Sequence, residues 1–392
     1  MSIEISFDLD FSQEQIENKL VQNASSTKEL SLQYFTIYDI SKVLFENKDK
    51  FHNLEILKIN SCIFEGQILQ FLKFQSQLIQ IQLEGCWKIS SQALLEYVQV
   101  ANFSNLRSLN LSNTLINDNF IQILSTKENQ LEELNISFCN LLSDKGLMVL
   151  LSSKQLNKVK TLYLKCLRLT DLTISALIES QNFASTLTKL SIYKCFGCSS
   201  ESIVHLFQSP VSDKLQYFDA SSSLFDDDCI RAIVDKDLKD LKTLKFYECN
   251  KVSSEGVKYL FESQIIQRLE VLDISWIYFE NNVLEILQNK DLKLKELCFP
   301  MVPSIQNETL LKFIQESKLL NTVEVLDLSY NQVDDQIINY ILQQKKNGKN
   351  IPLRDLQVYG CDKILNKKQL QKDSSVFDLV IYLILHLKYH EP

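Results

Sequence analysis

Leucine and isoleucine residues recur along the chain in a frame of nine positions, L-x-x-L-x-L-x-x-C, whose intervening residues are mostly polar. The frame is clearest at Leu131, Leu134, Ile136 and Cys139. We number its positions 1 to 9, so Leu131 is position 1 and Cys139 is position 9. The mean spacing between copies is about 27 residues, within the range of repeat proteins. The thirteen copies start at Thr27, Leu54, Leu78, Leu106, Leu131, Val159, Leu187, Leu215, Leu241, Leu269, Leu294, Val323 and Leu353.

A second pattern follows the frames: a small polar or acidic pair, and then apolar residues at helical spacing. The stretches that begin at Ser143, Ser253 and Asp334 show it most clearly. These residues are of the types that cap helix N-termini, and the acidic residues after them suit the positive end of a helix dipole. Each repeat is therefore predicted to be a short strand, a turn and a helix of roughly three turns.

The alternating apolar residues give each strand one face that a single repeat cannot bury. Stacked repeats would join their strands into a parallel sheet with a spacing of ~4.8 Å, whereas packed helices need ~8–10 Å. We therefore expect an α/β solenoid curved into a horseshoe, with the parallel sheet on the concave face and the helices on the convex face. The unbroken register predicts one continuous array over residues 27–370.

The two ends of the chain are expected to cap this array, because an open solenoid would expose its terminal cores. In residues 1–26, Ser12 and Gln15 have the spacing of a capping box and predict a helix that continues to about Gln22. The apolar stretch that begins at Val376, within residues 371–392, is expected to cover the last repeat. A strand is predicted before the first helix from the strict alternation of Ile3, Ile5, Phe7, Leu9 and Phe11.

Position 9 of the frame explains most of the cysteines. It holds Cys in six copies, Thr, Ser or Asn in one each, and an apolar residue in four. A position that accepts thiol, hydroxyl, amide and leucine is neither a metal ligand nor a nucleophile. We expect a compact packing residue that can hydrogen-bond a neighbouring backbone group. The six cysteines, predicted to be buried and reduced, are Cys62, Cys86, Cys139, Cys195, Cys249 and Cys361.

The other four cysteines have separate explanations. Cys229 lies in a helical pattern and is assigned to the core. Cys195 and Cys198 form a C-x-x-C pair, which can indicate a redox or zinc site, but no second pair completes four ligands. Cys166 and Cys298 fall at outward-facing strand or turn positions, and their role is open.

Composition and motifs favour a protein without catalytic chemistry. The net charge of -8 disfavours nucleic acid as a partner, and the lysines Lys345, Lys346 and Lys349 form only a short cluster, which we interpret as a solvated turn. No phosphate-binding glycine loop, zinc motif or plausible catalytic triad occurs, and the acidic run Asp226, Asp227 and Asp228 is explained as the start of a helix. No signal peptide or membrane-spanning run is evident, so we expect an intracellular protein without cofactor or metal.

The repeats resemble the leucine-rich-repeat superfamily, and among its classes the cysteine-containing one found in F-box/LRR proteins. A repeat of that class is similar to L-x-x-L-x-L-x-x-C-x-x-[IVL]-[ST]-D-x-[GS]-[IVL]. Residues 131–147 fit nearly throughout, and residues 241–257 fit with Ser254 in place of Asp. The resemblance covers about 85% of the chain and implies the solenoid fold, but the class serves many unrelated partners.

Outward-facing aromatic residues near the repeat's turn are the candidate partner site. Aromatic side chains dominate protein–protein hot spots, and Trp276 is the preferred anchor. The alternative is that these side chains stack on each other along the sheet. The first four repeats offer mostly Asn, Ser, Gln and Glu there, with Tyr34 as the exception. The candidate residues are Phe138, Tyr163, Tyr193, Tyr217, Tyr247, Trp276, Tyr330 and Tyr359.

Three functions follow from these observations. The first is a non-catalytic scaffold that binds a protein partner on the concave face or rim, within a larger assembly. The second is a substrate receptor of a ubiquitin ligase, although the first 50 residues lack the Leu-Pro opening and apolar pattern of an F-box. The third is a structural subunit of ciliary axonemes, which the Gln-, Asn- and Lys-rich composition, typical of AT-rich unicellular eukaryotes, favours slightly.

Overall fold

A computed structural model describes residues 2–6, 12–34, 40–64, 66–288, 290–367 and 380–382. Their contacts group the chain into two compact units: unit 1 is Met1–Cys198 with Ser209–Ser212, and unit 2 is Ser199–Gln208 with Asp213–Pro392. Repeats in a solenoid contact mainly their neighbours, so such a grouping does not by itself separate independently folding domains. The prediction of one continuous array stays a prediction.

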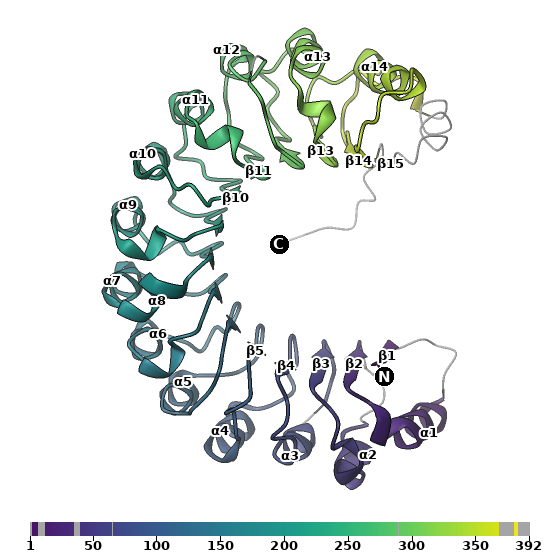
Figure 1. The fold of residues 1–392 in the computed structure, drawn as a ribbon, viewed down its shortest axis with the longest axis vertical. Helices are drawn as coiled ribbons and strands as arrows, with labels where there is room; N and C mark the ends of the chain where they lie inside the picture. Colours follow the sequence, from purple (N-terminus) through teal and green to yellow (C-terminus); the bar gives the residue numbers. More distant parts are fainter. Residues whose placement is uncertain are drawn as a thin grey trace. The chain divides into compact units, whose positions relative to one another are not determined.

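Unit 1 contains a parallel sheet whose strands follow one another in chain order. Its helices cover one face of this sheet, and among the described residues the other face carries no helix (Figure 1). Its strands are β1 (Ser2–Ser6), β2 (Glu29–Gln33), β3 (Ile56–Asn60), β4 (Gln80–Gln82), β5 (Ser108–Asn110), β6 (Glu133–Asn135), β7 (Thr161–Tyr163) and β8 (Lys189–Ser191). Its helices are α1 (Gln13–Asn23), α2 (Ser41–Glu46), α3 (Gln67–Leu72), α4 (Ser91–Val100), α5 (Asp118–Leu124), α6 (Asp144–Leu151), α7 (Asp171–Glu179) and α8 (Gln181–Thr186). Short 3-10 turns are Ala24–Ser26, Lys48–Phe51, Lys154–Leu156 and Pro210–Ser212.

Unit 2 has the same construction, again with parallel strands in chain order. Its strands are β9 (Tyr217–Asp219), β10 (Thr243–Lys245), β11 (Val271–Asp273), β12 (Glu296–Cys298), β13 (Val325–Asp327), β14 (Asp355–Gln357) and β15 (Val380–Tyr382). Its helices are α9 (Ser200–Gln208), α10 (Asp227–Lys236), α11 (Ser254–Glu262), α12 (Asn281–Glu285), α13 (Asn307–Glu316) and α14 (Asp335–Lys346). Its 3-10 turns are Ile265–Gln267 and Leu319–Asn321.

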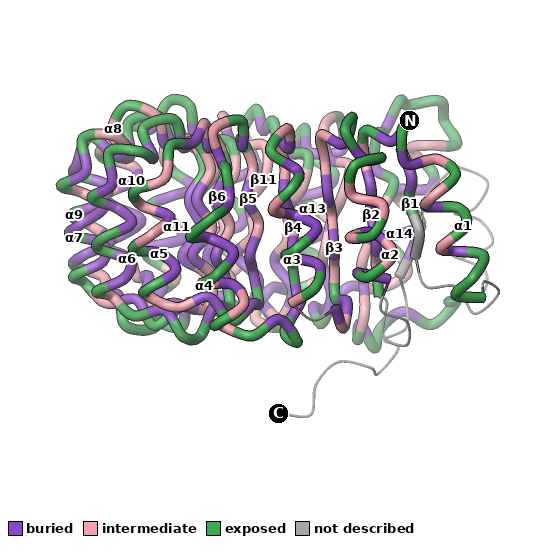
Figure 2. Tube along the Cα trace, turned by 90° about the horizontal axis from the view of Figure 1, so that it is seen from below, coloured by how far each residue is buried: buried purple, intermediate pink, exposed green. Residues whose placement is uncertain are grey.

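The core of each unit lies between sheet and helices and is built from the repeated apolar positions. In β6, Leu134 is fully buried, while Glu133 is exposed and Asn135 half-buried. The helices likewise bury one face, so buried and exposed stretches alternate along them (Figure 2). Phenylalanines link successive repeats; the rings of Phe225 and Phe246 stack with centroids 5.3 Å apart. The period-2 and helical patterns of the sequence therefore correspond to the buried faces.

Several helices are shorter than predicted. We expected about three turns in every repeat, but the helices in the three shortest repeats, which start at Leu54, Leu106 and Leu269, have only 6, 7 and 5 residues. Repeat length is not the only cause, because the 27-residue repeat that starts at Thr27 has a helix of 6 residues and the 26-residue repeat that starts at Leu215 has one of 10. In this detail the expectation was wrong.

The first helix begins as expected. The Ser12 hydroxyl accepts the Gln15 N–H, the Gln15 side chain accepts the Ser12 N–H, and α1 follows. Strand β1 occupies the start of the expected alternation. The remaining apolar residues of that strand, Phe7, Leu9 and Phe11, lie outside the described residues, as does most of the expected C-terminal cap. Of that cap, β15 is described, and it pairs with β14.

Acidic residues at the start of two helices accept hydrogen bonds from a serine of the next repeat. The Asp227 carboxylate accepts hydrogen bonds from the backbone N–H and the hydroxyl of Ser253, at 2.8 and 2.6 Å. A Cβ at Gly256 would lie 2.1 Å from Asp227 Oδ1, so the glycine makes room for this carboxylate. Asp118 contacts Ser143 in the same way, at 2.9 and 2.5 Å.

Two of the three expected N-caps cap their helix by side chain. Ser253 and Asp334 accept the N–H of the residue two further on. Ser143 stands at the N-cap of α6 but makes no side-chain capping bond. Its hydroxyl donates to Asp118, as the Ser253 hydroxyl does to Asp227.

Candidate protein-binding rim

Every repeat turns at the end of its strand through one residue in the left-handed region. This residue is position 8 in all thirteen copies, and only Gly85 and Gly360 among them are glycine. The backbone N–H of position 8 donates to the carbonyl of position 7 in the next repeat, as from Phe138 to Lys165 at 2.8 Å and from Trp276 to Pro300 at 2.9 Å. These bonds extend the ladder beyond the strand and fix the turn. The position 8 residues are Tyr34, Ser61, Gly85, Asn113, Phe138, Cys166, Lys194, Ser222, Glu248, Trp276, Met301, Tyr330 and Gly360.

Position 9 follows this turn and points into the core. The Cys139 thiol donates to the carbonyl of Leu111, which is position 6 of the preceding repeat, at 3.1 Å. The other five position 9 cysteines make the equivalent contact. Asn331 makes it through its amide, to Phe299 at 2.9 Å. All six cysteines are buried and none forms a disulfide, so the packing interpretation of Cys139 is confirmed.

Burial also raises the pKa of several of these thiols. It raises the pKa of Cys249 to about 11 and that of Cys86 to about 12. The pKa of Cys139 is raised for the same reason, against the hydrogen bonds from Thr114 and Asn113 that lower it. Because the thiolate is the reactive form of cysteine, a raised pKa lowers the reactivity of these three side chains at neutral pH.

The remaining cysteines include Cys198, Cys166 and Cys298, which the position 9 contact does not explain. Cys198 is buried beside Cys195, donates to the Thr170 carbonyl at 3.9 Å, and has a raised pKa because of burial. Cys166 and Cys298 are half-buried. Burial raises the pKa of Cys298, and the nearby carboxylates of Asp273, Asp327 and Glu296 raise it further. In the described parts of the chain, no three His, Cys, Asp or Glu side chains are grouped to hold a metal ion.

The strand face carries a further repeated contact that the sequence analysis did not identify. At position 5, Asn or Asp accepts the backbone N–H of a serine at position 7 and so fixes the end of the strand. Asn135 does this for Ser137 at 3.1 Å, and Asp327 does it for Ser329 at 2.9 Å. The signal is N/D-x-S within the frame, and it recurs at Asn110, Asp219 and Asp273.

The eight aromatic candidates occupy four different positions of the repeat, so they do not form one column. Phe138, Tyr163 and Tyr193 belong to unit 1 and the other five to unit 2. Those at position 8 are 41%, 54% and 36% exposed, and the other five are half-buried. Position 8 holds Phe138, Trp276 and Tyr330; position 7 holds Tyr193, Tyr247 and Tyr359; position 5 holds Tyr163 and position 3 holds Tyr217.

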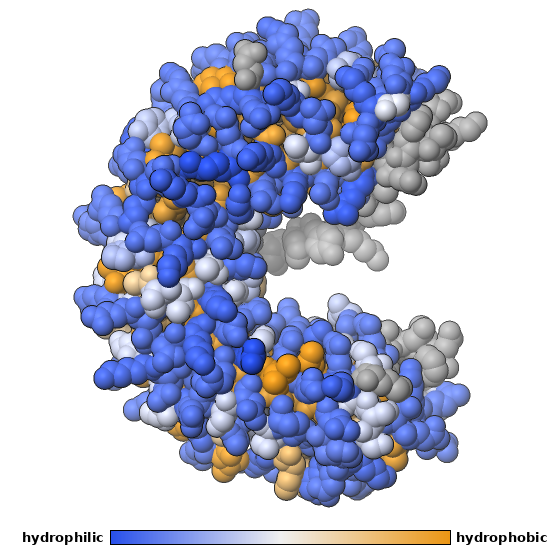
Figure 3. All heavy atoms as spheres, viewed as in Figure 1, coloured by the Kyte–Doolittle hydropathy of each residue, from blue (hydrophilic) through white to orange (hydrophobic). Residues whose placement is uncertain are grey.

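Exposed apolar side chains gather just after the strands instead. We call positions 8 to 11 of the repeats the C-terminal rim. Of the sixteen large hydrophobic residues that are exposed in the described chain, nine lie there. Elsewhere, on the side shown in Figure 3, hydrophobic residues form small patches in a largely hydrophilic surface. The nine are Tyr34, Trp87, Leu115, Phe138, Leu141 and Phe196 in unit 1 and Trp276, Tyr278 and Tyr330 in unit 2.

The sequence analysis missed most of this rim because it examined outward residues only as far as the turn. Trp87, Phe196 and Tyr278 stand at position 10, directly after the buried position 9. They are 55%, 63% and 59% exposed. Because Tyr34 and Trp87 lie in the first three repeats, exposed aromatic residues are not confined to the later repeats.

Comparisons with known proteins identify the fold. No protein-family model matches the chain, and no curated protein matches its sequence. A chain in the crystal structure of the Rad7 and Elc1 complex in yeast is similar with a TM-score of 0.57 and 16% identity, over 93% of this chain and 90% of that one. An internalin from Listeria monocytogenes gives 0.46 and 17%, over 93% and 92%. The TLR13–ssRNA13 complex gives 0.44 and 13%, over 93% and 52%.

Identities this low bear on the fold alone, and the Rad7–Elc1 structure has the TM-score that supports a common fold. The repeat frame, the parallel strands in chain order and the helices on one side of the sheet agree with it. No described helix is long and apolar enough to cross a membrane. The chain therefore has the α/β leucine-rich-repeat fold, with about thirteen repeats.

Proposed function

We propose that this protein is a non-catalytic scaffold that binds a protein partner through its C-terminal rim, as a subunit of a larger assembly. The observation that carries the proposal is the concentration of nine of the sixteen exposed large hydrophobic residues at the rim. Exposed apolar groups that gather in one part of the repeat, here positions 8, 10 and 11, are typical of interaction surfaces, whereas scattered ones need no explanation.

The rim also has the rigidity that a binding surface needs. Trp276 and Tyr278 flank the buried Ile277, and the backbone of Trp276 is held in the ladder by its bond to Pro300. The two aromatic side chains are thus presented on a fixed turn, which lowers the entropy lost when a partner binds. Leucine-rich-repeat folds are protein interaction scaffolds, and the similar yeast chain comes from a complex of two proteins.

The test is affinity purification of the full chain from cells that express it, with identification of the co-purifying proteins. A Trp276→Ala, Tyr278→Ala double variant is compared with Leu172→Ala, whose side chain is 60% exposed on helix α7. A hot-spot aromatic contributes about 2 kcal/mol or more, roughly 30-fold in affinity. We expect the double variant to lose a partner that the Leu172 variant keeps. Equal recovery with both variants would contradict the use of this part of the rim.

A second candidate is a substrate-recognition subunit of a ubiquitin ligase. It is favoured by the six position 9 cysteines, the feature that resembles F-box/LRR proteins. The same purification distinguishes it, because ubiquitin ligase subunits would be recovered with the chain. Recovery of axonemal proteins instead would assign it the structural role in cilia that its composition suggests.

A further inference from the structure

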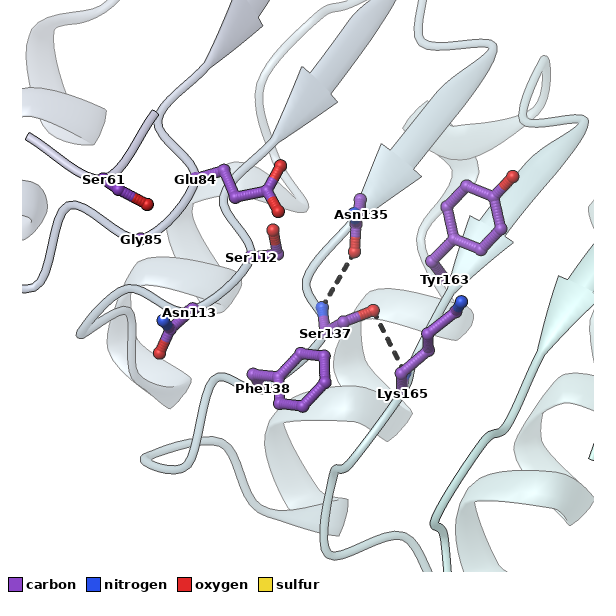
Figure 4. A pocket seen from close by; sticks show the side chains of 10 residues that line it. All are labelled: Ser61, Glu84, Gly85, Ser112, Asn113, Asn135, Ser137, Phe138, Tyr163 and Lys165. Atoms are coloured by element: carbon purple, nitrogen blue, oxygen red, sulfur yellow. Dashed lines mark hydrogen bonds between the residues drawn. The ribbon is translucent and has the colours of Figure 1, made fainter. Parts of the chain in front are cut away.

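A pocket of about 370 Å³ opens in unit 1 at the C-terminal ends of the strands (Figure 4). Its walls include Glu84, Ser112, Asn135, Ser137, Phe138 and Tyr163. Gly85, also in the wall, has a positive φ of 69°, and a Cβ there would lie 3.0 Å from the Ser61 hydroxyl oxygen. The pocket is far larger than the ~30 Å³ that one water molecule occupies, so it can accept a side chain.

Ser112 lines this pocket with a hydroxyl that lacks a hydrogen-bond partner. The residue is only 4% exposed, and its Oγ contacts no donor or acceptor among the described residues. Figure 4 shows it on the same side of the pocket as the Glu84 carboxylate. Buried hydroxyls without a partner are uncommon in folded proteins.

The neighbouring repeats explain why this hydroxyl is left over. Position 7 serines elsewhere accept the backbone N–H of position 7 in the next repeat, as Ser137 does from Lys165 at 3.1 Å and Ser329 from Tyr359 at 3.1 Å. The corresponding donor for Ser112 is the N–H of Ser137. That N–H donates to the Asn135 side chain instead. The Ser112 hydroxyl therefore remains unsatisfied in the wall of the pocket.

Glu84 supplies an oriented carboxylate without a counter-ion. Its Oε2 accepts hydrogen bonds from Gln82 at 3.1 Å and Asn110 at 3.2 Å, while its Oε1 has no partner and the carboxylate makes no ion pair in the described part of the chain. Two glutamates on the strands pair with lysine: Glu29 with Lys58 at 2.7 Å, and Glu296 with Lys245 at 3.3 Å. Among the described residues Glu84 has no such lysine, and the same is true of Glu133 in β6, which accepts a hydrogen bond from the Ser108 hydroxyl.

The aromatic residues divide the pocket. The Lys165 ammonium lies 5.6 Å from the centre of the Tyr163 ring. The Phe138 ring is 41% exposed, and no lysine or arginine of the described chain lies over it. The side of the pocket formed by Phe138 is therefore open. The aliphatic part of a basic side chain that binds Glu84 can lie there, away from Lys165.

We propose that this pocket receives an arginine or lysine side chain of a protein partner. The cationic group donates hydrogen bonds to Glu84 and to the Ser112 hydroxyl, and its aliphatic stem packs against Phe138. The proposal rests on the proposed function, because it names a side chain of the partner that binds beside the rim, where Glu84 and Ser112 occupy position 7.

The test begins with selection of short random peptides displayed on phage against the full chain. We expect the selected peptides to share an arginine or lysine. Its replacement by citrulline or glutamine, which removes the charge, should weaken binding to the wild-type chain about tenfold or more. For the Glu84→Gln variant, the same replacement in the peptide should weaken binding by less than about threefold. The exposed Glu128, between α5 and β6, gives the matched control Glu128→Gln, which should behave like the wild type.

Ser112→Ala separates binding from folding. It removes a hydroxyl without a partner, so the melting temperature should stay the same or rise, while peptide affinity should fall about threefold or more. Ser137→Ala removes the bond from Lys165 and should lower the melting temperature.

Peptides without a basic residue, basic peptides whose binding ignores Glu84, or no basic peptide recovered at all would overturn the pocket proposal. If the peptides depend on Trp276 and Tyr278 but not on Glu84, the scaffold function stands and this inference falls.

Discussion

The contact between Asp227 and Gly256 predicts that the effect of Gly256→Ala on the free energy of unfolding will change sign when Asp227 is replaced by alanine. In the wild-type chain, a methyl group at Gly256 would meet Asp227 Oδ1 at 2.1 Å. The backbone cannot move easily, so the carboxylate must swing away and lose both bonds to Ser253. Without the carboxylate, the same methyl group would have room.

The magnitudes follow from those contacts. Each exposed hydrogen bond contributes about 1 kcal/mol, so losing both costs about 2 kcal/mol. Replacing a helical glycine by alanine stabilises the folded state by about 0.5–1 kcal/mol. We therefore expect Gly256→Ala to lower the free energy of unfolding by about 1–1.5 kcal/mol in the wild type. In an Asp227→Ala background it should raise that free energy by about 0.5–1 kcal/mol, a coupling of about 2 kcal/mol.

The assay is urea unfolding of the wild type, both single variants and the double variant, followed by far-ultraviolet circular dichroism. Asp118 and Gly146, where the Cβ distance would be 2.2 Å, provide an independent repetition in unit 1. An equal effect of Gly256→Ala in both backgrounds would refute the steric and hydrogen-bonding explanation.

Three further predictions concern the thiols and the array. Cys139→Ser should destabilise less than Cys139→Tyr, which overpacks the turn by about 1–3 kcal/mol; urea midpoints in the opposite order would reject the packing role. Because burial raises the folded-state pKa of Cys249 above that of an unfolded thiol, its contribution to stability should be complete below about pH 8 and be lost from about pH 9 to 11. Unfolding across that range should show a weaker pH dependence for Cys249→Ser than for the wild type, and identical curves would exclude this contribution. Limited proteolysis should yield no two separately stable halves, and their isolation would show that the array is not continuous.

The repeated core could be predicted from the sequence because equivalent residues are buried in every copy of the repeat. Leu134 and Cys139 have equivalents throughout, so their burial could be predicted from one repeat. The left-handed turn could not, because position 8 is occupied by residues as different as Phe138 and Glu248. There the backbone is fixed by bonds to the next repeat rather than by glycine.

Features that depend on contacts between two neighbouring repeats could also not be predicted from the pattern of a single repeat. Ser112 and Ser137 stand in almost identical segments, LNLS and LNIS. Only Ser137 finds a donor, because the next repeat presents the N–H of Lys165 to it, whereas the N–H that faces Ser112 is taken by Asn135. The exposure of Trp87 and Tyr278 likewise depends on how neighbouring turns stack.

The most direct test of rim binding pairs two measurements on the same variant. Once a partner has been purified, its dissociation constant and the melting temperature of the chain are measured for the wild type and for Trp276→Ala, Tyr278→Ala. Both side chains are more than half exposed, so their loss leaves no core cavity and the melting temperature should change little. The dissociation constant should rise roughly 30-fold or more. An unchanged dissociation constant together with a large fall in melting temperature would show that these aromatic residues stabilise the turns and do not bind the partner.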